Sequence, residues 1–281
     1  MFWGFAAILG DLIQLSWYMI TLWRVLLASI SLMILIRLGS IKWNVKQKDV
    51  FAYSMIGIVI AGHWLTFFGS IKFANASVAL VTFASVSFMI SILEPLLIKS
   101  KFSYIELGLG ILIIPAMALI VNTLDTSMHT GFYLGIVSAF LAVLFGVMNK
   151  KLISNADPLV ITCIEMIAAT IFLLVCLPVW LHFVPHDILI PMRNDWYYLA
   201  ALVLGCTTYA FYVSVRSLRY LTVFSQSMVM NLEPVYGIFF AVIILGENRE
   251  LGYHFYVGVC VILLTVFLHP ILKRKLSEVP S

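Results

Sequence analysis

The sequence predicts an all-α polytopic membrane protein of ten transmembrane helices, arranged as two inverted five-helix repeats with both termini cytoplasmic. Three observations lead to this fold class: an extreme composition, ten apolar stretches, and short sequences that recur in the two halves. Of the 281 residues, 63% are hydrophobic and only 11% are charged. Soluble domains average roughly 45–50% apolar and about 25% charged residues. This composition excludes soluble enzymes and free nucleic-acid-binding proteins.

Charged and turn-forming residues divide the chain into ten candidate spanning helices. The expected ranges are 2–15, 17–37, 50–71, 76–98, 104–121, 131–152, 158–180, 195–217, 222–245 and 251–270. A spanning helix needs about 20 mostly apolar residues. The first stretch is short, because 14 residues at 1.5 Å each reach about 21 Å of a roughly 30 Å hydrocarbon core.

The distribution of basic residues sets the expected orientation. With the 38–49 loop in the cytoplasm, 13 of the 17 Lys and Arg residues lie inside, and only Lys72, Arg193 and Arg249 lie outside. Arg24 is within the membrane. An excess of cytoplasmic Lys and Arg is typical of membrane proteins. We therefore expect a multi-pass protein of the cytoplasmic (inner) membrane, with the 181–194 loop outside.

The two halves of the chain resemble each other faintly. Ser70-Ile71-Lys72-Phe73-Ala74 ends the third stretch, and Ser217-Leu218-Arg219-Tyr220-Leu221 ends the eighth, 147 residues later. Because each half has an odd number of helices, the second repeat enters the membrane inverted. We expect a first repeat at 1–125, a second at 126–272 and a cytoplasmic tail at 273–281. Inverted repeats of this kind hold substrate near the midplane, between the halves.

Two similar Glu-Pro pairs are expected to lie at different depths. Pro95 precedes Gly110 by 15 residues, whereas Pro234 precedes Gly258 by 24. With these glycines as anchors, Glu233 corresponds to Ser85 rather than to Glu94. We expect Glu94 to have an interfacial role near the cytoplasmic end of the fourth helix.

Ionisable residues at membrane depth are costly and usually face a partner or water. Arg24 and Glu165 each lie about seven residues into their helices from opposite faces, and we expect them to pair as a gate or substrate site. A structural ion pair, or separate partners for each charge, is the alternative.

Glu233 is expected near the midplane, with Pro234 kinking its helix. A proline removes one amide donor and frees carbonyl groups in the preceding turn. These carbonyls, with Glu233 and Asn231, are candidates to bind substrate amines or a coupling cation. A neutral Glu233 beside a packing kink is the alternative.

Aromatic and polar residues of the third and eighth helices complete the expected site. His63, Trp64 and Phe67 could bind an organic solute, and His63 could carry coupling protons; an interhelical histidine among lipid-facing aromatics is equally compatible with the sequence. Further cavity candidates are Tyr209, Tyr212 and Ser85.

Several sequence motifs of this chain resemble those of a known family. The run Asn231-Leu232-Glu233-Pro234-Val235-Tyr236-Gly237, followed by Leu245-Gly246-Glu247, resembles the ninth helix of EamA-type transporters of the drug/metabolite transporter (DMT) superfamily. Trp3-Gly4, Arg24 and the run from His63 to Phe68 fit the same pattern. The resemblance implies ten helices in two repeats and export or exchange of small metabolites by alternating access. The first half departs from the pattern, because Ile98-Lys99-Ser100-Lys101 replaces the Leu-Gly-Glu turn.

We therefore expect a secondary-active or facilitative transporter, an exporter of small organic metabolites, with its site between the repeats. Its expected partners are a metabolite, the lipid bilayer and coupling protons, with no cofactor, resident metal or nucleic acid. Two alternatives remain open. The spacing of His182 and Asp187 matches that of lipid acyltransferases, which would make the chain a membrane-embedded enzyme. A non-transporting receptor or scaffold is the other.

Overall fold

The computed structural model describes residues 2–99, 102–230, 232–247 and 252–277, and all regular structure within these ranges is helical. The elements of the first half are α1 (Phe2–Leu12), α2 (Trp17–Leu38), α3 (Gln47–Phe73), α4 (Ala76–Phe83), α5 (Val86–Ile98), α6 (Tyr104–Ile111) and α7 (Ile113–Thr123). The second half contains η1 (Thr126–Met128), α8 (His129–Leu152), α9 (Pro158–Phe183), α10 (Asp195–Val203), η2 (Leu204–Tyr209), α11 (Ala210–Ser217), α12 (Val223–Met230), α13 (Glu233–Phe240), η3 (Ala241–Leu245) and α14 (Tyr253–Ser277).

Six helical stretches of the described residues are long and apolar enough to cross a membrane. They are Trp17–Leu38, Gln47–Phe73, Ala76–Ile98, Thr126–Leu152, Pro158–Phe183 and Asp195–Ser217. Shorter apolar helices occupy Trp3–Leu12, Ile113–Thr123, Glu233–Leu245 and Tyr253–Thr265, each overlapping a stretch expected to span. The all-α membrane fold is therefore confirmed.

Two of the expected spans are broken at matching places. The stretch 76–98 changes from α4 to α5 at Ala84 and Ser85, and the stretch 222–245 changes from α12 to α13 just before Glu233. The correspondence of Ser85 with Glu233, inferred from glycine spacing, agrees with these two breaks. Pro234 does not kink a continuous helix, as the sequence suggested. It lies in the first turn of α13, where a missing amide hydrogen removes no intrahelical bond.

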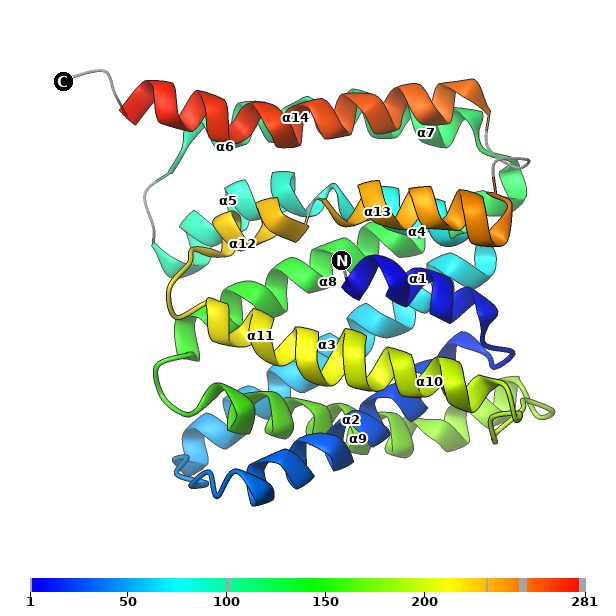
Figure 1. Ribbon diagram of the computed structural model, residues 1–281, viewed down its shortest axis with the longest axis vertical. Coiled ribbons are helices and arrows are strands. Elements are labelled where there is room, and N and C mark those ends of the chain that lie inside the picture. Colours follow the sequence, from blue (N-terminus) through cyan, green and yellow to red (C-terminus); the bar gives the residue numbers. More distant parts are fainter. Residues whose placement is uncertain (1, 100–101, 231, 248–251, 278–281) are drawn as a thin grey trace.

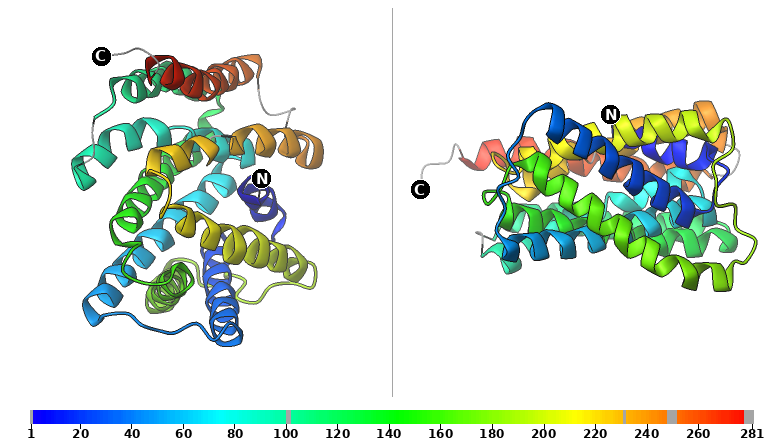
Figure 2. Two further views of the ribbon diagram at one scale, coloured as in Figure 1. Left: turned by 60° about the vertical axis from the view of Figure 1, so that its left-hand side comes forward. Right: turned by 90° about the horizontal axis from the view of Figure 1, so that it is seen from below.

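The helices of the two halves pack against each other rather than forming separate bundles. In Figure 1, α3 crosses the centre of the molecule and packs on α8, α9 and α2, while α14 lies against α7 and α6 at one edge. Figure 2 shows the same layer of α14, α6 and α7 from a second direction. The centre of the fold is therefore built from both halves.

A stripe of small residues allows α8 to approach α3 and α4 closely. A Cβ atom added to Gly135 would lie 2.1 Å from Thr82 Oγ1, and one added to Gly131 would lie 2.5 Å from the Cβ of Ala74. Contacts this short leave no room for a methyl group. Gly131 and Gly135 therefore let α8 pack directly on α3 and α4.

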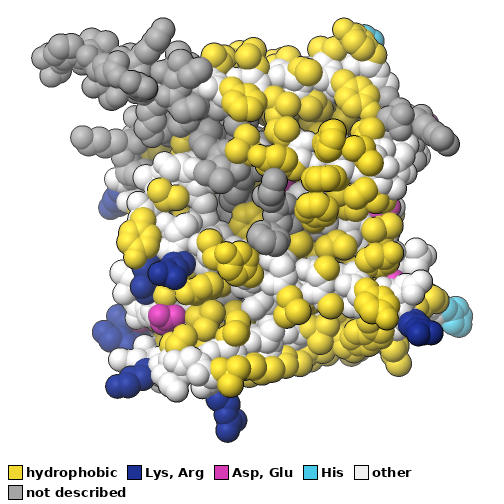
Figure 3. All heavy atoms as spheres, in the orientation of Figure 1, with side chains coloured by type: hydrophobic (Ala, Val, Ile, Leu, Met, Phe, Trp, Pro, Cys, Tyr) yellow, Lys and Arg dark blue, Asp and Glu magenta, His cyan; other side chains and the backbone are white. Residues whose placement is uncertain are grey.

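Exposed basic side chains gather at one end of the molecule, as Figure 3 shows at the left of the view. This end carries the loops after α2, α5, α8 and α11, and its exposed basic residues include Arg37, Lys42, Lys48, Lys151 and Arg219. We call it the basic face, and we call the other end, where α4 begins and η3 ends, the opposite face.

Candidate functional site

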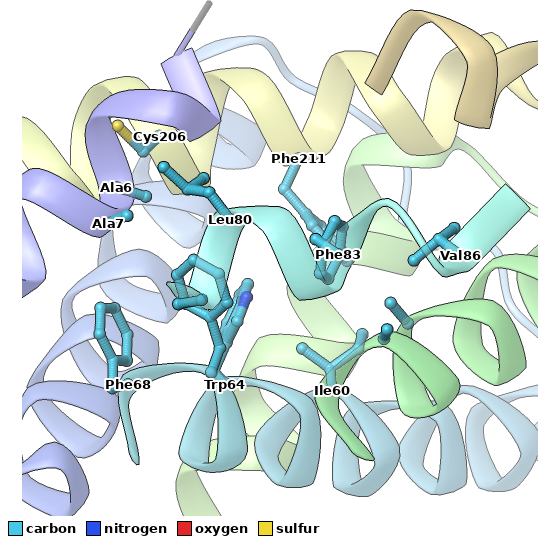
Figure 4. Close-up of a cluster of buried hydrophobic side chains, with 14 of the residues drawn as sticks. Ala6, Ala7, Ile60, Trp64, Phe68, Leu80, Phe83, Val86, Cys206 and Phe211 are labelled. Atoms are coloured by element: carbon cyan, nitrogen blue, oxygen red, sulfur yellow. The ribbon is translucent and has the colours of Figure 1, made fainter. Parts of the chain in front are cut away.

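A cavity lies at the centre of the fold, where helices of the two halves meet. It has a volume of about 40 Å³, room for a few water molecules at roughly 10–15 Å³ each. Its lining residues are Trp3, Ala6, Arg24, His63, Trp64, Phe67, Phe83, Phe145, Phe211 and Glu233. Figure 4 shows Trp64, Phe83 and Phe211 pointing toward this region from α3, α4 and α11. Aromatic rings thus surround one guanidinium, one imidazole and one carboxyl group.

The Arg24 guanidinium is fixed in the cavity by two hydrogen bonds and a cation–π contact. Its side chain is 2% exposed, its Nε donates to Thr207 Oγ1 at 2.8 Å, and its Nη2 donates to the Cys206 carbonyl at 3.4 Å. The guanidinium also lies 4.0 Å from the centre of the Trp64 ring, a cation–π contact. These partners fix the position of the positive charge while one edge of the group faces the cavity.

A π-helical turn, η2, supplies both polar partners of Arg24. A π-turn widens the helix and changes the backbone pairing, and such turns are frequent at functional sites. Here the Cys206 carbonyl accepts from Trp3 Nε1 at 2.9 Å as well as from Arg24. Thr207 and Cys206 were not expected from the sequence as partners of Arg24, because no composition or periodicity signal marks a π-turn.

Glu233 provides the carboxyl group of the cavity. It is the first residue of α13, is 7% exposed, and interacts electrostatically with Arg24. Asn231, its expected neighbour in the site, lies outside the described residues. Arg24 and Glu233, one from each half of the chain, line the same cavity, while the hydrogen bonds of Arg24 go to Thr207 and Cys206.

Glu165 is not the partner of Arg24, which corrects the sequence-based expectation. Its side chain is fully buried in α9, and within the described part of the chain neither carboxylate oxygen has a hydrogen-bond partner. The amide of Asn149 is its polar neighbour, close enough to interact but outside hydrogen-bond geometry. Gly57 of α3 packs directly on this turn, because a Cβ there would lie 2.3 Å from the Glu165 carbonyl oxygen. The pair forms a separate polar site between α3, α8 and α9.

His63 lines the cavity but is also bonded to α8. Its Nδ1 lies 2.8 Å from Ser138 Oγ and 3.0 Å from the Ser138 carbonyl oxygen. The ring is packed among aromatic neighbours, including Phe83 at 5.5 Å and Phe145 at 5.4 Å between ring centres. Trp64 and Phe67 line the same cavity, so the expected cluster of His63, Trp64 and Phe67 does face the interior.

Three further candidates do not line the central cavity. Tyr209 is 57% exposed on the surface of the fold. The Tyr212 hydroxyl accepts from Arg216 Nη1 at 3.4 Å, toward the basic face. Ser85 donates to the Thr82 carbonyl at 2.7 Å, within the break between α4 and α5. These three side chains are therefore not among the residues that line the central cavity.

A smaller cavity of about 20 Å³ lies next to the central one, toward the basic face. The two cavities share Phe145 as a lining residue, and the smaller one adds the polar side chains of Asn149, Ser214 and Gln226. Phe145 therefore separates an aromatic chamber from a more polar one.

The two Glu-Pro pairs do lie at different depths, which confirms the expectation from glycine spacing. Glu233 faces the central cavity, whereas Glu94 binds backbone amides at the start of α12, near the basic face.

In the loop before α10, Asp187 accepts from Ser16 Oγ and Trp180 Nε1, both at 2.6 Å. Asp187 therefore joins the loop to α2 and α9.

Comparison with known proteins identifies the family of this chain and a solved structure with the same fold. The model of the EamA-like transporter family matches twice, over residues 1–122 and 129–269. One solved crystal structure of a protein superposes with a TM-score of 0.70 at 12% sequence identity, covering 96% of this chain and 97% of that one, which shows a shared fold. The comparison with curated proteins finds no match. Because the two family matches span nearly the whole sequence, the chain belongs to the EamA-like transporter family, a family of membrane transporters of the DMT type.

Proposed function

We propose that this protein carries small organic metabolites across the cytoplasmic membrane by alternating access, with the central cavity as its substrate site. The observation that carries the proposal is the cavity itself: both repeats line it, and it holds Arg24 and Glu233 within an aromatic wall. Intramembrane ionisable residues that face a cavity mark transport pathways. The expected direction is export.

The proposed topology has ten crossings with both termini inside. The basic face is then cytoplasmic, in agreement with the positive-inside rule. Helices lie within each of the ten expected stretches, and four of the expected spans are interrupted by a break or a π-turn. Broken helices are tolerated at membrane depth where they line a cavity or are buried in protein.

The chemistry of the cavity indicates the class of solute. A cavity of about 40 Å³ is too small for an organic metabolite, so we propose that it widens when substrate binds. Arg24 offers hydrogen-bond donors to an acidic group, and Glu233 offers acceptors to an amine. Rings of Phe67, Phe83 and Phe211 offer apolar contact. A metabolite with a polar end and an apolar body fits these groups.

Coupling protons have two candidate carriers. Glu233 lines the proposed substrate site, and Glu165 is buried beside the amide of Asn149. A carboxyl group buried in this way is costly and, in transporters, belongs to proton relays. We assign substrate contact to Glu233 and proton coupling to either carboxyl group.

The test is a solute screen followed by transport. Purified protein is melted with libraries of amino acids, nucleosides, sugars and aromatic metabolites, because a ligand that binds only the folded state raises the melting temperature. Solutes that raise it are then tested for counterflow in proteoliposomes. Phe83→Ala should reduce counterflow, whereas Tyr209→Phe, which alters an exposed side chain, should not. A ligand that binds without any flux would favour a receptor instead.

A further inference from the structure

Two buried glutamates connect the two broken helical stretches at opposite faces of the molecule. On the basic face, Glu94 at the end of α5 accepts from the backbone amides of Val223 at 3.2 Å and Phe224 at 2.9 Å. These are the first two residues of α12. Glu94 is 7% exposed, so the contact lies inside the fold.

The opposite face carries the same arrangement with the roles exchanged. Glu247, which follows η3, accepts from the backbone amides of Ala76 and Ser77, both at 2.9 Å. These are the first two residues of α4. Glu247 is 5% exposed. Each broken stretch therefore ends in a carboxylate that caps the beginning of the other.

The local caps also correspond between the two sites. Asn75 Oδ1 accepts from the third amide of α4 at 2.9 Å, and Thr222 Oγ1 accepts from the third amide of α12 at 3.0 Å. Asn75 and Thr222 are 147 residues apart, the same spacing as the repeated sequence at Ser70 and Ser217. The two capped helix starts are thus equivalent under the inverted repeat.

This symmetry explains the missing Leu-Gly-Glu turn of the first half. Glu247 is the glutamate of that turn in the second half, and Glu94 makes the equivalent contact from within α5 in the first. The first amides of a helix have no partners inside the helix, and the helix dipole favours a negative charge there. A bidentate carboxylate therefore binds either helix start strongly, with charge-assisted hydrogen bonds.

We propose that Glu94 and Glu247 are the two gate latches of the transport cycle, each holding one face closed by capping the opposing helix start. This rests on the proposed transport function. With both caps formed, α4–α5 and α12–α13–η3 are joined at both ends, and the cavity between them is closed. Opening one face breaks one cap and leaves the other, so the two states of alternating access differ in which latch is intact.

The test measures access to the cavity from each face. Ala6→Cys is placed in a background in which Cys163, Cys176, Cys206 and Cys260 are replaced by Ser, since Ala6 lines the cavity and is 3% exposed. Right-side-out and inside-out vesicles are then treated with a membrane-impermeant maleimide. Glu247→Ala should raise the labelling rate roughly tenfold from the opposite face only, the factor expected for losing charge-assisted hydrogen bonds. Glu94→Ala should do the same from the basic face only.

The control and the second variants keep the test decisive. Asp125→Ala removes an exposed carboxylate cap, which accepts from the Ser127 amide at 2.9 Å, and should change neither rate. If an alanine variant does not fold, Glu247→Gln or Glu94→Gln should give a smaller change with the same sidedness. Equal increases from both faces, or no change, would overturn the latch proposal. One-sided labelling without flux of any solute would support the latches and refute the transport function. Flux of a solute together with equal labelling from both faces would support transport and refute the latches.

Discussion

Removing the positive charge of Arg24 should destabilise the protein and identify its counter-charge. The guanidinium donates to Thr207, a charged hydrogen bond of about 1.5–3 kcal/mol, and stacks on Trp64, worth about 0.5–2 kcal/mol. Breaking one partner of a buried pair costs about 3–5 kcal/mol. For Arg24→Gln we therefore expect a loss of about 3–5 kcal/mol, which lowers the melting temperature by roughly 6–20 °C.

The assay is thermal unfolding of purified protein, arranged as two double-mutant cycles. Arg24→Gln with Glu233→Gln should be non-additive by about 0.5–3 kcal/mol, because the two charges share a cavity. Arg24→Gln with Glu165→Gln should be additive within about 0.5 kcal/mol. Arg24→Lys keeps the charge but loses the Nε donor, so its melting temperature should lie between those of the wild type and Arg24→Gln. If the Arg24 and Glu233 substitutions are additive while those of Arg24 and Glu165 are coupled, the expected interaction of Arg24 with Glu233 is refuted.

Three further predictions concern packing, topology and pH. Gly135→Ala should lower stability by about 1–3 kcal/mol through overpacking against Thr82, whereas Gly252→Ala, where an added Cβ meets nothing within 4 Å, should not; equal melting temperatures of the two variants would contradict the close α8–α4 contact. In a cysteine-free background, Lys46→Cys and Asp187→Cys should react with impermeant maleimide from opposite sides, and labelling from the same side would refute the ten-crossing topology. Burial outweighs the hydrogen bonds from Ala76 and Ser77 and raises the pKa of Glu247 above its usual value, so ionising this carboxyl group costs more in the folded than in the unfolded protein, and stability falls as pH rises from the unfolded value of about 4.3 through the folded pKa. Glu247→Gln, neutral at every pH, should remove that slope from melting curves recorded across this range, and an unchanged slope would contradict the assignment.

Composition and periodicity predicted the class of fold because they depend on the bilayer rather than on tertiary contacts. An apolar stretch of sufficient length must form a helix in a membrane, since its backbone polar groups have no other partners there. Helices therefore lie within every expected range. The two repeats were also visible, because the runs that begin at Ser70 and Ser217 keep a short similarity between the halves, and the family model matches each half.

The partners of individual charges were not predictable in the same way. Depth alone placed Arg24 and Glu165 near each other, but rotation about the helix axis decides which neighbour a side chain faces. The π-turn η2 and the break before Glu233 both change that rotation, and neither has a signal in hydropathy. For the same reason Tyr209 was assigned to the cavity although it faces outward, and Phe83, Phe145 and Phe211 were overlooked.

The central claim is that substrate passes through the cavity between the repeats in contact with Glu233. The most direct measurement is counterflow of the solute found by the stability screen, recorded against pH for wild type and Glu233→Gln at matched amounts of folded protein. Glu233→Gln keeps the shape of the side chain, so the account predicts normal folding with reduced flux, and an altered pH profile if this group carries the proton. Wild-type flux at every pH would contradict the claim and move the search to Arg24, His63 and Glu165.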